Sequence, residues 1–402
     1  MSEDKDDAKM GVEKMVDIPR NLVFSEEEYR RRMNAVQEGM KENDLQVLLL
    51  FSPEHIFYLS GYQTFGYFSY QALIVPAAGE PILILRFLES FLARHYSWVS
   101  RVECWEDHED PVAVTVRFLK ELNLTKGRIG LEDRGYYTTF AITRRFSEAL
   151  PDAFFVDGAR IVERVRVRKS PEELSYIRKA AEYSSLGMVA GAGESKVGRT
   201  ENDVAAAIFD AMTRAGSEYS PHDPIVTSGW RSGIPHTTYE RRRFEPGDTV
   251  LMEITGTYHR YVAPFMRTAV VGSASTKVSE MASLVVEGLE AAIAAIRPGI
   301  TAGGVDDACR GIMERAGYYE NFRKRTGYSV GFGFPPSWNE GHIVSLRKGD
   351  STPLEPGMVF HLPVALRDYG VSCVGLSETV LVTENGCEVL TSSPRRLMTG
   401  GE

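Results

Sequence analysis

The sequence has 402 residues, of which 43% are hydrophobic and 25% are charged, and its net charge is −9. A chain of this length and composition can bury two sizeable cores, so we expect two domains. The acidic balance, with no basic block and no interleaving of aromatic and basic residues, argues against a nucleic-acid partner.

The first residues, MSEDKDDAKMGVEK, are acidic and contain no apolar run. We therefore expect residues 1–20 to form a disordered tail and not a secretory signal. No apolar stretch approaches the length of a membrane span, so we predict a cytoplasmic protein without a membrane partner. The cysteines lack C-x-x-C spacing, which predicts free thiols; they are Cys104, Cys309, Cys373 and Cys387.

The first half of the chain alternates helical and strand patterns. The run SEEEYRRRMNAVQEGMKEN predicts a helix capped by Ser25, and the buried strand VLLLF follows at residues 47–51. Further strands are predicted at QALIVP, PILILRF, RVECW and RIGLED, and helices at FLESFLARHYSWV and VAVTVRFLKELN. Because this alternation is typical of a sheet covered by helices, we predict an α/β amino-terminal domain over residues 21–165.

The second half, residues 166–402, alternates long helices with short β segments. Helices are predicted at 171–193, where Pro171 takes the first helical position, and at 201–215 and 278–296. The sequences EPGD and EPGM precede the strands VLMEIT and VFHLPVAL, as turns with proline in second position do. We predict helices packed outside a curved antiparallel sheet, which is an α+β domain.

Residues 250–268, VLMEITGTYHRYVAPFMRT, have the frame of the strand pair that carries two aspartate ligands in two-metal peptidases. This frame resembles the pita-bread family, which includes methionine aminopeptidase, aminopeptidase P, prolidase and creatinase. The resemblance runs from about Phe24 to the end of the chain. It implies the creatinase-like two-domain architecture, with an α/β amino-terminal domain and an α+β pita-bread carboxy-terminal domain.

The metal-ligand positions of this family have mostly lost their ligands. Carried over residue by residue, they fall on Glu253, on Pro264, on Tyr328, on or beside Leu362, and on Glu378. Two hard cations about 3.5–4 Å apart need several carboxylates and usually a histidine. We therefore predict neither a metal nor another cofactor in this chain.

Within the family, the sequence is most similar to the ectoine hydrolases. The stretches that carry this resemblance are IPHTTY at 234–239, RTGYSVGFGFPPSWNEG at 325–341, SLRKGD at 345–350 and GMVFHLPVAL at 357–366. The resemblance implies a hydrolase that opens a cyclic amidine, converting ectoine to N-acetyl-diaminobutyrate. The sequence departs from that branch in having APFM before Arg267, and Phe65 where a tryptophan is expected.

Without a metal, such a reaction needs a general base or a protein nucleophile. Glu253 interrupts an apolar strand, so it is either the nucleophile or one partner of a buried ion pair with Arg267. The resemblance makes His236 the proton-transfer residue. Glu378 is the third catalytic candidate; it would hold a ring nitrogen or orient His236, or serve as a buried strut.

The substrate is expected to be a small zwitterionic or cationic molecule. Its carboxylate needs an arginine, and its flat cationic ring suits aromatic side chains. The candidate substrate-binding residues are Tyr328, His361, Arg267, Phe65, Trp338, Arg325 and Tyr258.

Three other readings remain open from the sequence. The protein could be a creatinase-like amidinohydrolase, a hydrolase like the Xaa-Pro dipeptidases, or a pita-bread scaffold that binds a partner without catalysis. The family resemblance also implies a homodimer.

Overall fold

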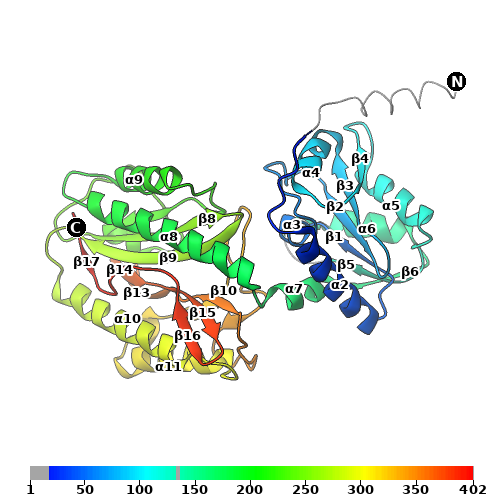
Figure 1. Cartoon of the computed structure of the whole chain (residues 1–402). Coiled ribbons are helices and arrows are strands. Elements are labelled where there is room, and N and C mark those ends of the chain that lie inside the picture. The colour runs from blue at the N-terminus through cyan, green and yellow to red at the C-terminus, as the bar shows by residue number, and fades with distance from the viewer. Residues whose placement is uncertain (1–17, 133–135, 402) are drawn as a thin grey trace. The chain divides into compact units, whose positions relative to one another are not determined.

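The computed structural model describes residues 18–132 and 136–401. The tail expected at residues 1–20 therefore lies, apart from residues 18–20, outside the described part. The chain divides into two compact units, one ending at Val165 and the other beginning at Arg166 (Figure 1). Within the described ranges, no helix is both long and apolar enough to cross a membrane.

The first unit contains a six-stranded mixed sheet with the order β4-β3-β2-β1-β5-β6. Its strands are β1 (Val47–Leu50), β2 (Ala72–Pro76), β3 (Ile82–Arg86), β4 (Arg101–Trp105), β5 (Gly127–Leu131) and β6 (Ala153–Asp157). Its helices are α2 (Glu26–Glu42), α3 (Pro53–Ser60), α4 (Ser90–Tyr96), α5 (Pro111–Glu121), α6 (Phe140–Ala149) and α7 (Ala159–Arg166). This architecture confirms the predicted α/β class.

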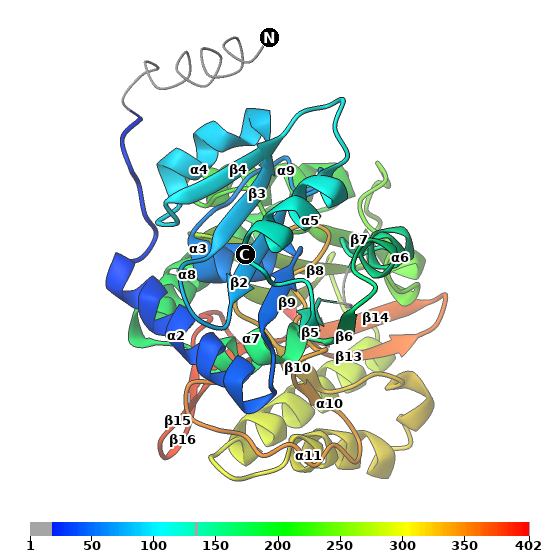
Figure 2. The same cartoon turned by 90° about the vertical axis from the view of Figure 1, so that its right-hand side faces the viewer.

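Both faces of the central strands are covered, which explains the continuous apolar run at β1. Val47 and Leu49 belong to one core with Phe118 of α5 and Phe146 of α6, so these two helices cover one face of the sheet (Figure 2). Helix α2 begins where predicted, because the Ser25 side chain accepts a hydrogen bond from the backbone of the helix's first turn.

The helix predicted over FLESFLARHYSWV is shorter than expected. It consists of a 3₁₀ turn at Phe87–Glu89 followed by α4, which ends at Tyr96. The next two residues are held by other partners: Ser97 Oγ donates to the carbonyl of Ser60 at 2.8 Å, and Trp98 Nε1 donates to the carbonyl of Leu59 at 2.7 Å. These tertiary hydrogen bonds stop the helix before its apolar pattern ends.

The second unit contains three small sheets, with orders β17-β9-β8-β7, β11-β10-β12-β15-β16 and β13-β14. Its strands are β7 (Ile225–Ser228), β8 (Thr249–Tyr258), β9 (Tyr261–Val270), β10 (Gly327–Ser329), β11 (Ser345–Leu346), β12 (Val359–His361), β13 (Val364–Asp368), β14 (Ser372–Leu376), β15 (Thr379–Thr383), β16 (Gly386–Val389) and β17 (Met398–Thr399). The pairs are antiparallel except β17 with β9.

Four long helices flank these sheets. They are α8 (Pro171–Glu194), α9 (Glu201–Arg214), α10 (Thr276–Ala295) and α11 (Ala302–Arg315). Helices α8 and α9 lie on one side of the strands and α10 and α11 on the other (Figure 1). The α+β prediction is confirmed.

Gly256 lets β8 approach α8, because a Cβ atom there would lie 2.4 Å from the carbonyl oxygen of Ala180.

The two Pro-Gly sequences form the predicted turns. The backbone of Asp248 donates to the carbonyl of Glu245 at 3.1 Å, and Gly247 has a φ of 90°. The EPGM turn repeats this arrangement, with Gly357 at a φ of 87°. A positive φ in third position with proline in second is the signature of a type II turn.

Candidate active site

Glu253 is the charged residue that interrupts the buried strand β8. Its side chain is 17% exposed, and its Oε1 atom lies 4.0 Å from Nδ1 of His361 on β12. Its partner across the β8–β9 pair is Met266. The alternative role of Glu253 as the ion-pair partner of Arg267 is wrong, because that guanidinium pairs with Glu378.

A chain of hydrogen bonds runs through His361. The antiparallel pairing of β10 with β12 puts Tyr328 opposite His361. Tyr328 Oη lies 3.0 Å from His361 Nδ1, and Trp338 Nε1 donates to the same Oη atom at 3.1 Å. On the other side of the imidazole, Ser377 Oγ lies 2.7 Å from Nε2. Tyr328, Trp338 and His361 are therefore joined in one chain of contacts, which reaches Glu253 through His361.

The electrostatics of this site favour a neutral imidazole next to an anion. Burial lowers the pKa of His361 well below its ordinary value, and the nearby Lys324 lowers it further. Burial also raises the pKa of Tyr328, and the charge of Glu253 acts in the same direction. The pKa of Lys324 is lowered by burial, although Glu253 opposes that shift. At neutral pH the site therefore contains a protonated phenol and an uncharged imidazole.

Glu378 is held in a different group of contacts. Its Oε1 atom accepts hydrogen bonds from Arg267 at 2.6 Å and from Arg395 at 3.2 Å, and its Oε2 atom accepts one from Thr391. Glu378 and Arg267 are both almost fully buried. Ser377 and Glu378 link β14 to β15, and it is Ser377, and not Glu378, whose side chain contacts His361.

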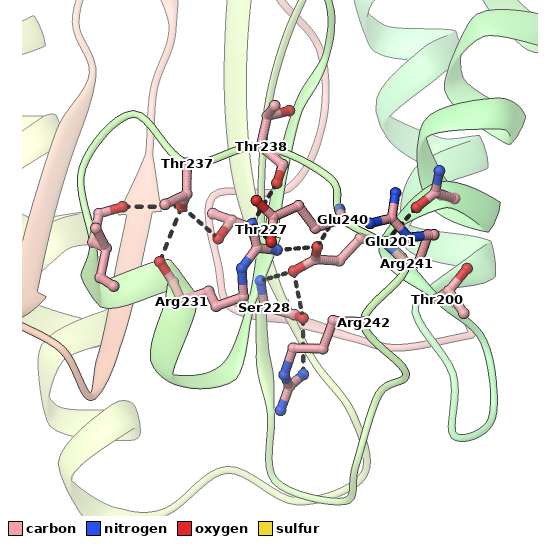
Figure 3. A network of polar contacts seen from close by, with 12 residues as sticks. Thr200, Glu201, Thr227, Ser228, Arg231, Thr237, Thr238, Glu240, Arg241 and Arg242 are labelled. Atoms are coloured by element: carbon pink, nitrogen blue, oxygen red, sulfur yellow. Dashed lines mark hydrogen bonds and ion pairs between the residues drawn. The ribbon is translucent and has the colours of Figure 1, made fainter.

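His236 is exposed on the loop between β7 and β8. The buried carboxylate of Glu201 anchors this loop (Figure 3). Glu201 accepts hydrogen bonds from the backbone and side chain of Ser228, from the backbone of Glu240, and from Arg231. These contacts fix both ends of the loop. His236 itself has a φ of 60°, and in the described part of the chain no hydrogen bond or ion pair joins its side chain to Glu253.

The other predicted binding residues lie in several places. The Arg325 guanidinium lies 4.7 Å from the centroid of the Tyr328 ring, so it belongs to the site. Tyr258 stands at the far end of β8, where its ring packs 5.5 Å from Tyr176. Phe65 belongs to the first unit and is 68% exposed.

Ser377 and Lys324 are site residues that sequence reasoning missed. Ser377 stands one position before Glu378 in the link between β14 and β15, and only the three-dimensional structure reveals that it contacts the imidazole. Lys324 precedes Arg325 in a basic run, RKR, that looks like an ordinary solvated segment.

The two-domain architecture, an α/β unit followed by an α+β unit, defines a protein of the pita-bread class. Family models match residues 32–168 as the creatinase/prolidase N-terminal domain and residues 175–384 as metallopeptidase family M24. The chain belongs to metallopeptidase family M24.

Among its relatives are an uncharacterized hydrolase/peptidase of Sinorhizobium fredii, 31% identical over 94% of this chain and 99% of the relative, and the ectoine hydrolase of Halomonas elongata, 28% identical with the same coverage. Similar solved structures include the dipeptidase PepE from Mycobacterium ulcerans, with a TM-score of 0.81, 27% identity, and coverage of 94% and 99% of the two chains. The prolidase from Pyrococcus horikoshii OT3 has a TM-score of 0.80 and 26% identity, with coverage of 92% and 100%.

A metallopeptidase family implies bound metal, but the residues present do not fit a two-metal centre. Pro264 and Leu362 carry no ligand atom in their side chains, and Glu378 is committed to two arginines. Within the described ranges, no three histidine, cysteine, aspartate or glutamate side chains are grouped as metal ligands. The remaining donors near Glu253 are a phenol, an imidazole and a hydroxyl, which do not supply the charge that two divalent cations need.

Proposed function

We propose that this protein is a hydrolase that opens the ring of a cyclic amidine, with ectoine as the leading substrate and N-acetyl-diaminobutyrate as the product. The observation that carries the proposal is the environment of Glu253: a carboxylate beside a neutral imidazole and a protonated phenol, in the strand frame that the family uses for metal ligands. The relationship to the Halomonas ectoine hydrolase supports this choice of substrate.

The proposed reaction starts at the amidine carbon. A carboxylate oxygen of Glu253 forms a bond to that carbon, and the C=N electron pair moves onto nitrogen. The opposite ring C–N bond then breaks, and the departing nitrogen takes a proton. Water finally displaces the carboxylate, so that the net change is the addition of one water. The negative charge of Glu253 also attracts a cationic amidine before the bond forms.

His236 is the proposed proton donor to the departing nitrogen. An imidazole can donate a proton in its charged form and accept one in its neutral form, so one histidine can donate to the departing nitrogen and then accept a proton from water. The Glu201 network holds the loop of His236 at both ends, which limits the positions that the imidazole can take. Glu378 has no direct chemical role in this scheme; its contacts suit a buried strut for Arg267.

For the carboxylate of the substrate, Arg325 is the proposed partner. Its guanidinium donates to two neutral acceptors, Ser345 Oγ at 2.6 Å and Asn339 Oδ1 at 3.1 Å, so its charge is available to an anion. Arg267 is less suitable because it is fully buried against Glu378. Lys324 adds a second positive charge near Glu253.

We also propose that the protein is a cytoplasmic homodimer. An aromatic surface on the first unit supports the dimer. Phe65, Phe68, Tyr136 and Phe140 are 68%, 78%, 75% and 80% exposed, and the ring of Tyr67 lies 6.2 Å from Phe65, 6.4 Å from Phe68 and 6.1 Å from Tyr137. Exposed apolar groups of this size are typical of protein interaction sites.

A substrate panel tests the proposed activity. Ectoine, hydroxyectoine, creatine and an Xaa-Pro dipeptide are each incubated with the wild-type protein and with Glu253→Gln, and the products are identified by mass spectrometry. We expect ring opening of an amidine by the wild type alone. Urea from creatine would instead support a creatinase-like enzyme, dipeptide cleavage would support a peptidase, and binding without conversion would support a scaffold.

A further inference from the structure

The hydrogen bonds around His361 leave two possible proton arrangements. Trp338 fixes one end of the chain, because an indole Nε1–H group can only donate. Tyr328 Oη therefore accepts from Trp338. The phenol proton can then point either to Nδ1 of His361 or toward the substrate site, depending on which imidazole nitrogen carries a proton.

In the first arrangement Tyr328 donates to Nδ1, and Nε2–H donates to Ser377. The lone pair of Nδ1 then lies 4.0 Å from the carboxylate oxygen of Glu253, which places two electron-rich atoms close together. In the second arrangement Ser377 donates to Nε2 and Nδ1–H donates to Tyr328. The carboxylate oxygen then has a polarised N–H group, and not a lone pair, 4.0 Å away, in a site from which most water is excluded.

The second arrangement is therefore favoured electrostatically. It also has a consequence for Tyr328, whose oxygen then accepts from both Trp338 and His361. With both lone pairs of the phenol used, its O–H group has to donate elsewhere.

We infer that His361 carries its proton on Nδ1, that Ser377 selects this tautomer by donating to Nε2, and that Tyr328 is thereby fixed as a hydrogen-bond donor to the substrate at Glu253. Ser377 and Trp338 are positioning residues, and Tyr328 is a catalytic one. The inference about the tautomer is independent of the substrate, and the role of Tyr328 rests on the proposed function.

The chemical value of this donor follows from the reaction. When Glu253 bonds to the amidine carbon, the C=N electron pair becomes a lone pair on nitrogen. Tyr328 can donate to that lone pair, which exists only after the attack has begun. A hydrogen bond that forms in the transition state and is absent from the bound substrate raises kcat and leaves KM nearly unchanged.

The tautomer can be measured directly by two-bond ¹H–¹⁵N correlation on the full-length protein labelled at histidine. The resonances of His361 are assigned by their loss in His361→Asn. We expect the pattern of an Nδ1-protonated ring in the wild type and in Ser377→Thr, which keeps the hydroxyl. We expect that preference to weaken in Ser377→Ala. An Nε2-protonated ring in the wild type would overturn the inference.

Kinetics then test the catalytic role on a substrate that the wild type converts. Tyr328→Phe should lower kcat by about 10²–10³-fold, the loss typical of one donor to a developing charge, with KM within about threefold. Ser377→Ala should lower kcat, and Ser377→Thr should restore it. Tyr70→Phe is the matched control, because its hydroxyl bonds Thr115 in the first unit.

If Tyr328→Phe raised KM and left kcat unchanged, its role as a transition-state donor would be refuted. If the wild type converts no amidine, the proposed function fails, while the tautomer measurement still decides the arrangement around His361. The two failures are therefore distinguishable.

Discussion

Substitution of Glu378, which forms a buried ion pair with Arg267, tests whether this glutamate has a structural or a catalytic role. In Glu378→Gln, the Arg267 guanidinium, which is 0% exposed, loses its charged partner. The amide keeps the size of the side chain and one oxygen acceptor, but it leaves two arginines, Arg267 and Arg395, without the negative charge between them. We expect the substitution to lower stability and to leave the chemical step largely intact.

The magnitude follows from the burial of both partners. Removing one member of a buried ion pair typically costs about 3–5 kcal/mol, because the other charge stays desolvated and unpaired. Because the amide keeps one oxygen acceptor, we expect the loss of stability in Glu378→Gln to lie at the lower end of this range, at about 3 kcal/mol. For a unit of this size each kcal/mol lowers Tm by about 2–4 °C, so we expect a fall of about 6–12 °C.

Urea unfolding followed by circular dichroism measures this loss, and kcat is measured on the folded fraction at low temperature. Glu388→Gln is the matched control. That glutamate makes a two-point ion pair with Arg178 at an exposed position, so its loss should cost about 0–1 kcal/mol. A variant Glu378→Gln with unchanged stability and a large loss of kcat would refute the reasoning and return Glu378 to the catalytic residues.

Three further outcomes are expected. Glu253→Gln should lower turnover by about 10³-fold or more with an unchanged circular dichroism spectrum, because the amide cannot act as the nucleophile; near-normal turnover would exclude that role. Burial opposes ionisation of Glu132, but the charge of His55 and the hydrogen bonds from His55 and Ser52 lower its pKa to about 2. The wild type should therefore be more stable than Glu132→Gln above about pH 5. Because the carboxylate binds its proton more weakly in the folded protein, this advantage should fall as pH falls from 5 to 2, by about 3 kcal/mol in total when unfolding is measured in urea; a pH-independent difference would contradict it. Phe68→Glu should shift a dimer toward monomer in analytical ultracentrifugation, and an unchanged mass would argue against the aromatic surface as the interface.

The fold could be predicted from the sequence because local signals agreed with the global pattern. The cap at Ser25, the proline at Pro171 and the two Pro-Gly turns each mark the beginning of an element, and apolar periodicity identifies the helices between them. The prediction failed at the end of α4, where hydrogen bonds to residues distant in the sequence override the helical pattern of 97–99.

Part of the site could also be predicted. Glu253 and Tyr328 stand at ligand positions of the family frame, and His361 is a candidate substrate-binding residue; the structure brings the three together. It is harder to predict which of two neighbouring side chains faces the site, because an alignment error of one residue exchanges the two. The family frame points to Glu378, whereas the residue that contacts the imidazole is its neighbour Ser377.

The contribution of Lys324 was not visible in the sequence for a different reason. Its importance arises from a three-dimensional environment, in which burial lowers its pKa and the charge of Glu253 opposes that change. A basic residue next to Arg323 and Arg325 has no sequence signal that distinguishes a site lysine from a solvated one.

The most direct test of the central claim is to incubate chelator-treated protein with ectoine and to follow the small molecules by mass spectrometry. We predict conversion to a product heavier by one water, at the same rate with and without added manganese or cobalt. Activity that disappears with chelator and returns with either metal would contradict a carboxylate and histidine mechanism at Glu253.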